Sequence, residues 1–179
     1  MEIRKCLVAQ SKSVGEFYDS VVKFMDDNGV NYTKWRYKIY PSTGYARDAA
    51  RAGDLFVCVD GEKICAAFVL SEDPEGDYSK VIWSQNLSLG EFLVLHAFAV
   101  APDCQRRGLG KKIVEYCANY AAENYRALRV DIVPENFPAK KFYETCGFKF
   151  VGTADLGRTS TGVPQFCCYE RILSDECTG

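Results

Sequence analysis

The amino-acid sequence predicts a single α/β (α+β) domain with a mixed central sheet of about six to seven strands flanked by about four helices. The chain has 179 residues, of which 47% are hydrophobic, and this suits one globular core. In some segments apolar residues recur at every second position, as in strands, and in others they recur about every 3.6 positions, as in helices. In the second half, strand, glycine-rich loop, helix and strand follow directly, as in a βαβ unit. We therefore expect residues 1–179 to form one domain.

The N-terminal segment is expected to contain a strand followed by a helix. Residues 2–10 have strand-like composition. Ser13 and Glu16 are spaced as a capping box, which predicts a helix beginning there and ending near Gly29.

The middle of the chain is expected to contain a second short helix and then a β-hairpin. The helix should end before Gly53, and two apolar runs within residues 55–72 flank an Asp60-Gly61 turn. Periodicity fades over residues 73–90, which indicates a loop, and Val81 to Trp83 form an exposed or half-buried apolar patch within it.

The most regular pattern begins after this loop. Residues 91–102 are apolar on both alternating faces and end at a proline, as a central strand covered on both sides would be. Residues 108–123 have helical spacing of apolar and small side chains, and residues 127–133 alternate Leu128, Val130 and Ile132 toward a core. These segments predict the βαβ unit.

The C-terminal segment is expected to contain a short helix and two strands. Pro138 lies in the first turn of the helix and Gly147 ends it, with apolar residues at the intervening positions of one face. Strands are expected within residues 148–154 and 164–173.

Composition excludes several classes of protein. Nine scattered cysteines without Cys-x-x-Cys spacing, together with a single histidine, argue against a metal site and favour reduced, buried thiols. No apolar run approaches the about 20 residues of a membrane helix, and the N-terminus lacks a signal-peptide pattern. We expect a soluble cytoplasmic protein without a membrane partner. Because acidic residues slightly outnumber basic ones, 24 against 22, nucleic-acid binding is disfavoured.

The loop "QRRGLGKK", residues 105–112, concentrates four cations around two glycines in this slightly acidic chain. A glycine-rich turn before a helix exposes backbone N–H groups and the positive end of the helix dipole, which suits a phosphate or pyrophosphate. A Walker A loop is disfavoured because its Gly-Lys-Ser/Thr ending is missing, and the dinucleotide fingerprint is disfavoured because Ile113 stands where it needs a third glycine.

The loop fits Gln/Arg-x-x-Gly-x-Gly/Ala, and its context resembles a known family. "HAFAVAPDCQRRGLGKKIVEYCANYA" followed by "VDIVPENFPAKKFYETCGFKFVG" is similar to the GNAT superfamily of acetyl-CoA-dependent N-acetyltransferases. The resemblance is tight over residues 91–152, the expected acetyl-CoA-binding core. It rests on the joint occurrence of the strand end, the loop and the Asn-x-x-Ala-x-x-Phe-Tyr-Glu segment.

The resemblance implies a site for acetyl-CoA as the acetyl donor. Residues 105–111 would wrap the pyrophosphate, and the main chain at Phe98 and Val100 would hold the pantetheine arm. Asn136 would contact the pantetheine or instead cap the following helix, two alternatives that the sequence leaves open. The implied cofactor-binding residues are Phe98, Ala99, Val100, Gln105, Arg106, Arg107, Gly108, Leu109, Gly110, Lys111, Asn136, Ala139, Phe142 and Tyr143.

The implied chemistry is acetyl transfer to a primary amine by direct attack, and the resemblance implies two catalytic residues. His96 lies on the central strand, where an imidazole would accept the amine's proton, although a hydrogen-bonded core histidine is the alternative. Glu91 is the second candidate for this base, and water is a third. Tyr143 would stabilise the leaving thiolate by a hydrogen bond, with core packing as its alternative.

The acceptor has no motif that identifies it. The segments 32–51, 73–90 and 156–165 are expected to shape its pocket, and a small amine, a protein N-terminus and a lysine all remain open. The alternative function is a non-catalytic acetyl-CoA-binding sensor or assembly module, which the presence of both His96 and Tyr143 disfavours. A homodimer is left open.

Overall fold

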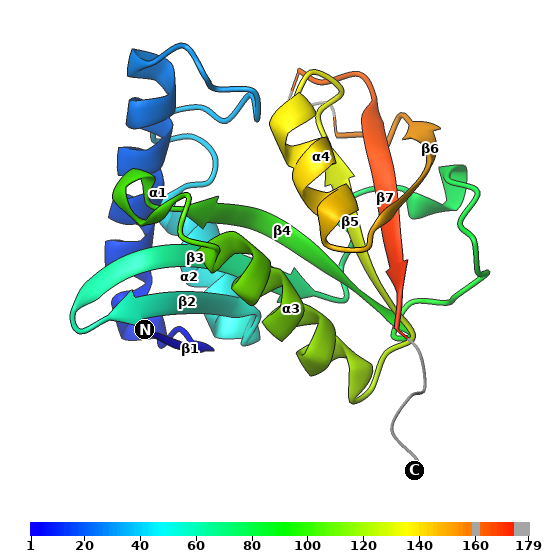
Figure 1. Ribbon diagram of the computed structural model, residues 1–179, viewed down its shortest axis with the longest axis horizontal. Helices are drawn as coiled ribbons and strands as arrows, with labels where there is room; N and C mark the ends of the chain where they lie inside the picture. The colour runs from blue at the N-terminus through cyan, green and yellow to red at the C-terminus, as the bar shows by residue number, and fades with distance from the viewer. Residues whose placement is uncertain (159–161, 174–179) are drawn as a thin grey trace. The chain divides into compact units, whose positions relative to one another are not determined.

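The computed structural model describes residues 1–158 and 162–173 (Figure 1). Among these residues the strands are β1 (Glu2–Lys5), β2 (Leu55–Asp60), β3 (Lys63–Ser71), β4 (Phe92–Val100), β5 (Ala127–Ile132), β6 (Lys149–Ala154) and β7 (Phe166–Ile172). The α-helices are α1 (Ser11–Asp27), α2 (Thr43–Ala52), α3 (Leu109–Ala122) and α4 (Phe137–Thr145). Short 3-10 helices are η1 (Val8–Gln10), η2 (Tyr78–Lys80) and η3 (Pro102–Cys104).

The strands form one mixed sheet in the order β1-β2-β3-β4-β5-β7-β6. Strands β4 and β5 pair in parallel, and α3 connects them, which confirms the predicted βαβ unit. The pairs β1–β2, β2–β3, β5–β7 and β6–β7 are antiparallel. A seven-stranded mixed sheet with four α-helices within the described residues confirms the predicted fold class.

The chain packs as two compact units. The first contains residues 1–31, 35–70 and 96–113, and the second contains residues 32–34, 71–95 and the part of the chain from residue 114 onward. Both β4 and α3 contribute residues to each unit.

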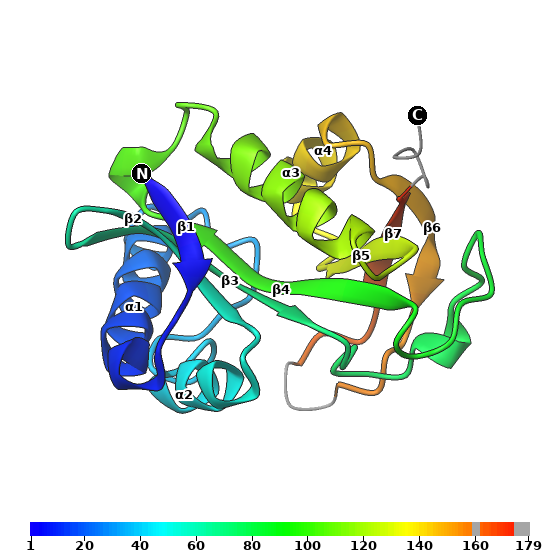
Figure 2. The ribbon, with the colours of Figure 1, turned by 90° about the horizontal axis from the view of Figure 1, so that it is seen from below.

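In the first unit, α1 and α2 lie on one face of the hairpin β2–β3 (Figure 2). The two helices approach closely because Gly15 has no side chain: a Cβ there would lie 2.2 Å from Oγ1 of Thr43. Ser42 caps α2 by accepting a hydrogen bond from the Tyr45 amide, and Gly53 ends it with a left-handed φ of 81°. The predicted second helix and hairpin are therefore confirmed.

The predicted start of α1 is wrong. The helix begins at Ser11 and not at a Ser13 cap, and strand β1 ends at Lys5 and not near residue 10. The reason is the short helix η1, which leads directly into α1, and the Ser11 hydroxyl donates a hydrogen bond back to the Val8 carbonyl at 2.7 Å. Ser13 therefore lies within the first turn, where no capping box forms.

In the second unit, α4 lies on one face of β5 and β7 (Figures 1 and 2).

The predicted apolar patch of the 73–90 loop does not stay together in the structure. Val81 is buried in the core and Trp83 packs against it, whereas Ile82 is 91% exposed.

Strand β5 is buried on both faces, although the sequence predicts only alternate residues inward. Arg129, on the unpredicted face, is 1% exposed and pairs with Glu170 of β7 at 2.8 Å between Nη2 and Oε1. Its guanidinium lies 4.0 Å from the ring centroids of both Trp83 and Phe92. This buried ion pair replaces the hydrophobic contact that an apolar residue would make.

Candidate active site

The end of β4 in the first unit is irregular at Ala97. This residue has φ of 46°, a left-handed conformation that is uncommon for a residue with a side chain. The Tyr18 hydroxyl donates a hydrogen bond to the Ala97 carbonyl at 2.8 Å and holds the irregularity in place. Because this conformation interrupts the alternation of faces, strand periodicity does not place His96 and Phe98 on the same face. His96 itself is 6% exposed.

The predicted phosphate loop, residues 105–112, has a left-handed backbone at two positions. Arg106 has φ of 61° and Gly108 has φ of 74°. Left-handed residues can turn N–H groups toward a bound anion where they alternate with right-handed ones. In this loop Gln105 is extended, with φ of −71° and ψ of 167°. The N-terminus of α3 follows at once: the Lys112 amide donates to the Gly108 carbonyl at 3.1 Å, and the amides before it belong to the open first turn.

Three contacts within the first unit anchor the start of this loop and the turn before it. Gln105 Nε2 donates to the Val100 carbonyl at 3.0 Å, and the Ala101 amide donates to the Cys65 carbonyl of β3 at 2.8 Å. Lys63 forms an ion pair with Asp103. The hydrogen bond from Lys63 lowers the pKa of that carboxyl.

These features fit a pyrophosphate. Arg106, Arg107, Lys111 and Lys112 are all exposed, so their charges can approach an anion at the loop. The Val100 carbonyl already accepts one hydrogen bond, and because a carbonyl oxygen has two lone pairs it can accept another from a bound pantetheine amide.

The second unit holds the remaining predicted residues on and before α4. The Asn136 side chain accepts a hydrogen bond from the Ala139 amide at 3.2 Å, so of its two sequence-based interpretations the cap is the one seen. Ala139 and Phe142 are half-buried, and Tyr143 is 8% exposed. The Tyr143 ring lies 5.2 Å, centroid to centroid, from the rings of both Phe142 and Phe148.

The Tyr143 hydroxyl makes no hydrogen bond to any described residue. Burial of the ring raises the pKa of Tyr143 well above that of an ordinary tyrosine, and Cys117, Cys146 and Asp131 raise it further. The phenol therefore remains a neutral hydrogen-bond donor.

Glu91, the second candidate for the base, is part of an ion pair in the second unit. Its carboxylate accepts hydrogen bonds from the Ser88 amide at 2.8 Å and from Arg126 at 3.4 Å. These hydrogen bonds lower the pKa of Glu91, the Ser88 amide contributing most. A carboxylate held in its charged form in this way is a weaker proton acceptor.

A buried cluster in the second unit was not predicted from the sequence. Asp131 of β5 pairs through both carboxylate oxygens with Arg158, and the Tyr78 hydroxyl donates to its Oδ2 at 2.8 Å. Arg158 also donates to the carbonyls of Pro74 and Glu75, both at 2.7 Å. The only sequence signal was a lone aspartate within an apolar strand.

Arg158 thus connects two of the three segments expected to shape the acceptor pocket, residues 73–90 and 156–165. Part of the latter, residues 159–161, lies outside the described residues. The cluster fixes the described part of one segment against the other.

No helix in the described part of the chain is long and apolar enough to span a membrane. Across residues 1–158 and 162–173, no three or more His, Cys, Asp or Glu side chains gather as a metal site would require. The eight cysteines in these ranges are buried free thiols, and Cys177 lies outside them.

The chain belongs to the acetyltransferase (GNAT) family, whose family profile matches residues 22–148. This span includes the end of β4, the phosphate loop and α4. Membership confirms the resemblance found in the sequence and makes the protein an acetyltransferase of the class that uses acetyl-CoA. No curated protein matches the chain in sequence.

Solved structures share the fold over nearly the whole chain. A GNAT-family acetyltransferase from Streptococcus agalactiae is 14% identical, with 97% of this chain and 96% of that chain covered and a TM-score of 0.78. A second from Listeria monocytogenes is 15% identical over 96% and 94% of the two chains, with a TM-score of 0.74. The protein yncA of Salmonella typhimurium, whose structure contains its cofactor acetyl-CoA, is 14% identical over 100% and 97%, with a TM-score of 0.67.

Proposed function

We propose that this protein transfers the acetyl group of acetyl-CoA to a primary amine by direct attack, the acceptor being a small amine or a protein N-terminus or lysine. The observation that carries the donor part is the loop at Arg106 to Gly108. Its left-handed backbone, its cations and the start of α3 together support an anion site there.

When bound, acetyl-CoA supplies an acetyl thioester, and the chain's residues would hold it. The amides of the loop and the charges of Arg106, Arg107 and Lys111 would neutralise the pyrophosphate. Backbone groups at Phe98 and Val100 would orient the pantetheine, and an N–H group near the Ala97 irregularity would polarise the thioester carbonyl. Ala139, Phe142 and Tyr143 would provide apolar contact from α4.

Proton transfer needs an acceptor and a donor. A lysine-type amine has a pKa of about 10.4, so only about one molecule in a few thousand is neutral at pH 7. We assign the proton acceptor to His96, since Glu91 is held charged by the Ser88 amide and Arg126. We assign thiolate stabilisation to Tyr143, because its hydroxyl is protonated and unused by any described residue.

An acceptor panel tests whether the protein is an enzyme or a non-catalytic acetyl-CoA-binding module. Polyamines, amino sugars, amino acids and peptides with free N-termini or lysines are supplied with acetyl-CoA, and release of free thiol is followed. Turnover with any of them supports the enzyme. Tight acetyl-CoA binding without turnover on the whole panel would favour the binding module.

Replacing Gly110 tests the donor site directly. Gly110→Glu adds a carboxylate in the first turn of α3, where it would repel the pyrophosphate, so we expect calorimetry to show loss of acetyl-CoA binding. Circular dichroism checks that the variant is folded. Glu16→Gln, which replaces an exposed residue of α1, is the control, and this variant should bind acetyl-CoA normally. Unchanged affinity in Gly110→Glu would remove the loop from the site.

A further inference from the structure

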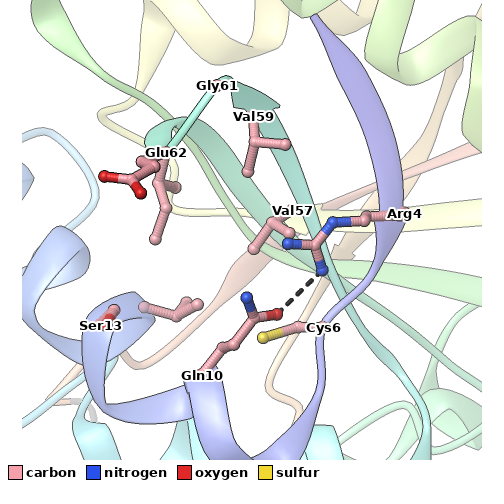
Figure 3. Close-up of a pocket in the computed structure, with 10 residues that line it drawn as sticks. Arg4, Cys6, Gln10, Ser13, Val57, Val59, Gly61 and Glu62 are labelled. Atoms are coloured by element: carbon pink, nitrogen blue, oxygen red, sulfur yellow. Dashed lines mark hydrogen bonds between the residues drawn. The ribbon is translucent and has the colours of Figure 1, made fainter.

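The first unit contains a pocket whose lining does not include the phosphate loop. It has a volume of about 330 Å³ and lies between strand β1, the start of α1 and the β2–β3 hairpin (Figure 3). This volume is in the range of small-molecule sites. It is lined by Arg4, Cys6, Gln10, Ser13, Val14, Val57, Val59, Gly61, Glu62 and Ile64.

One end of the pocket is cationic. Figure 3 shows the Arg4 guanidinium beside the Gln10 amide at the pocket wall. Arg4 is half-buried, and its Nη1 donates to Gln10 Oε1 at 2.9 Å and to the Lys5 carbonyl at 3.3 Å. Both partners are uncharged, and no carboxylate of the described residues forms an ion pair with Arg4.

The Arg4 charge therefore lacks a counter-ion within the described protein. Arginine has five N–H donors, and the two hydrogen bonds use only those on Nη1. The remaining donors on Nε and Nη2 match the geometry of a carboxylate, which accepts two parallel hydrogen bonds from a guanidinium. The N-terminus of α1, in whose first turn Ser13 lies, adds positive potential on the same side.

Apart from Ser13 and Glu62, the rest of the pocket wall is apolar. Val57 and Val59 project into it from β2, and Val14 and Ile64 complete the wall. An apolar body of a ligand would be removed from water here, which stabilises binding by about 25 cal/mol for each Å² buried. Glu62 at the hairpin turn is exposed at the rim and would repel a second negative charge on the ligand.

We propose that this pocket is a second ligand site, which binds a small monocarboxylate with a branched or short aliphatic body. Arg4 and Gln10 hold the carboxylate, and the valine and isoleucine side chains cover the body. The site is independent of the donor site, since none of its lining residues belongs to the loop of residues 105–111.

The probe is 4-methylpentanoate, titrated into the full chain and followed by calorimetry and by the amide resonances of Gly61 and Ser13. We expect saturable binding with a Kd at or below about 1 mM. Three related compounds should each bind at least about tenfold more weakly. The amide 4-methylpentanamide has no charge, and glutarate has a second negative charge. Inorganic phosphate has no apolar body.

Arg4→Met keeps the aliphatic stem and removes the charge, so the affinity should fall at least about tenfold. Arg47→Met, at an exposed arginine of α2, is the matched control and should bind as the wild type does. Val59→Phe fills the pocket without touching the charge and should also abolish binding, which keeps the test valid if Arg4→Met fails to fold.

Three results would overturn the proposal. The first is no saturable binding of the probe. The second is unchanged affinity in either folded variant, which would place the probe elsewhere. The third is phosphate binding as tightly as the probe, which would mean that the apolar wall contributes nothing.

Discussion

Tyr143→Phe separates an enzyme from a binding module because it removes one hydroxyl and little else. The phenyl ring keeps both edge-to-face contacts, each 5.2 Å between centroids, with Phe142 and Phe148. No hydrogen bond to a described residue is lost. The free energy of unfolding should therefore change by no more than about 0.5 kcal/mol.

The raised pKa of Tyr143 means that its hydroxyl acts as a hydrogen-bond donor and does not give up its proton. Even an ordinary phenol, with a pKa of about 10, would lose about 2 kcal/mol in giving its proton to a thiolate with a pKa of about 8.5. Burial makes the transfer more unfavourable, so the hydroxyl should act as a neutral donor. A hydrogen bond to a charged group contributes about 1.5 to 3 kcal/mol. At about 1.36 kcal/mol for each factor of ten, kcat should fall by about 10- to 200-fold.

The assay is steady-state thiol release with an acceptor found in the panel, under conditions where chemistry is shown to be rate-limiting. The KM for acetyl-CoA should stay nearly unchanged, because the hydrogen bond forms only as the thiolate departs. Tyr125→Phe removes the hydroxyl that bonds Glu72 and serves as the control. Full kcat in Tyr143→Phe would make Tyr143 a packing residue. A loss far beyond 200-fold would show that the proton is fully transferred.

Further predictions concern a base, a buried ion pair and the thiols. His96→Ala should flatten the rise of kcat/KM with pH, and a wild-type profile would assign the proton to Glu91 or water. Glu170→Gln leaves Arg129 buried without its counter-charge and should lower the free energy of unfolding in urea by about 3 to 5 kcal/mol, whereas a loss under about 1 kcal/mol would contradict the reasoning. Burial raises the pKa of Cys104 to about 11 and of Cys168 to about 12, so above about pH 8.5 the unfolded chain releases protons that the folded chain keeps. The contribution of these thiols to the free energy of unfolding should thus be constant below that pH and should lower the free energy as pH rises toward 12, and a stability that stays flat from about pH 8.5 to about pH 10 would contradict it.

The order of the elements could be predicted because it depends on local periodicity. Strand β4, helix α3 and strand β5 each carry a pattern that is visible in one window of sequence, and the hairpin carries its turn residues. The start of α1 could not be predicted, because Ser13 and Glu16 match a capping box whether or not a 3-10 turn precedes them. The structure extends the helix to Ser11 through η1, which has no comparable sequence signal.

The buried ion pairs, which join residues distant in sequence, could not be predicted. Asp131 and Arg158 are 27 residues apart, and Arg129 and Glu170 are 41 apart. In a single sequence each of these charges looks like a surface residue. Their burial becomes apparent only when β5, β7 and the loop between β6 and β7 are assembled, and the same holds for Arg4 and the valines of its pocket.

The backbone at Ala97 joins the fold to the proposed chemistry. A non-glycine residue with φ of 46° costs on the order of 1 to 3 kcal/mol and persists only where its surroundings enforce it. Tyr18, fully buried on α1, provides that constraint through its hydrogen bond to the Ala97 carbonyl. With the carbonyl fixed, the backbone at Ala97 is held in this conformation, between His96 and the loop that begins at Gln105. Donors that are fixed before the reaction are those that stabilise a developing negative charge at the least cost. The strain in β4 therefore supports a role for this strand end in acetyl transfer as well as in cofactor binding.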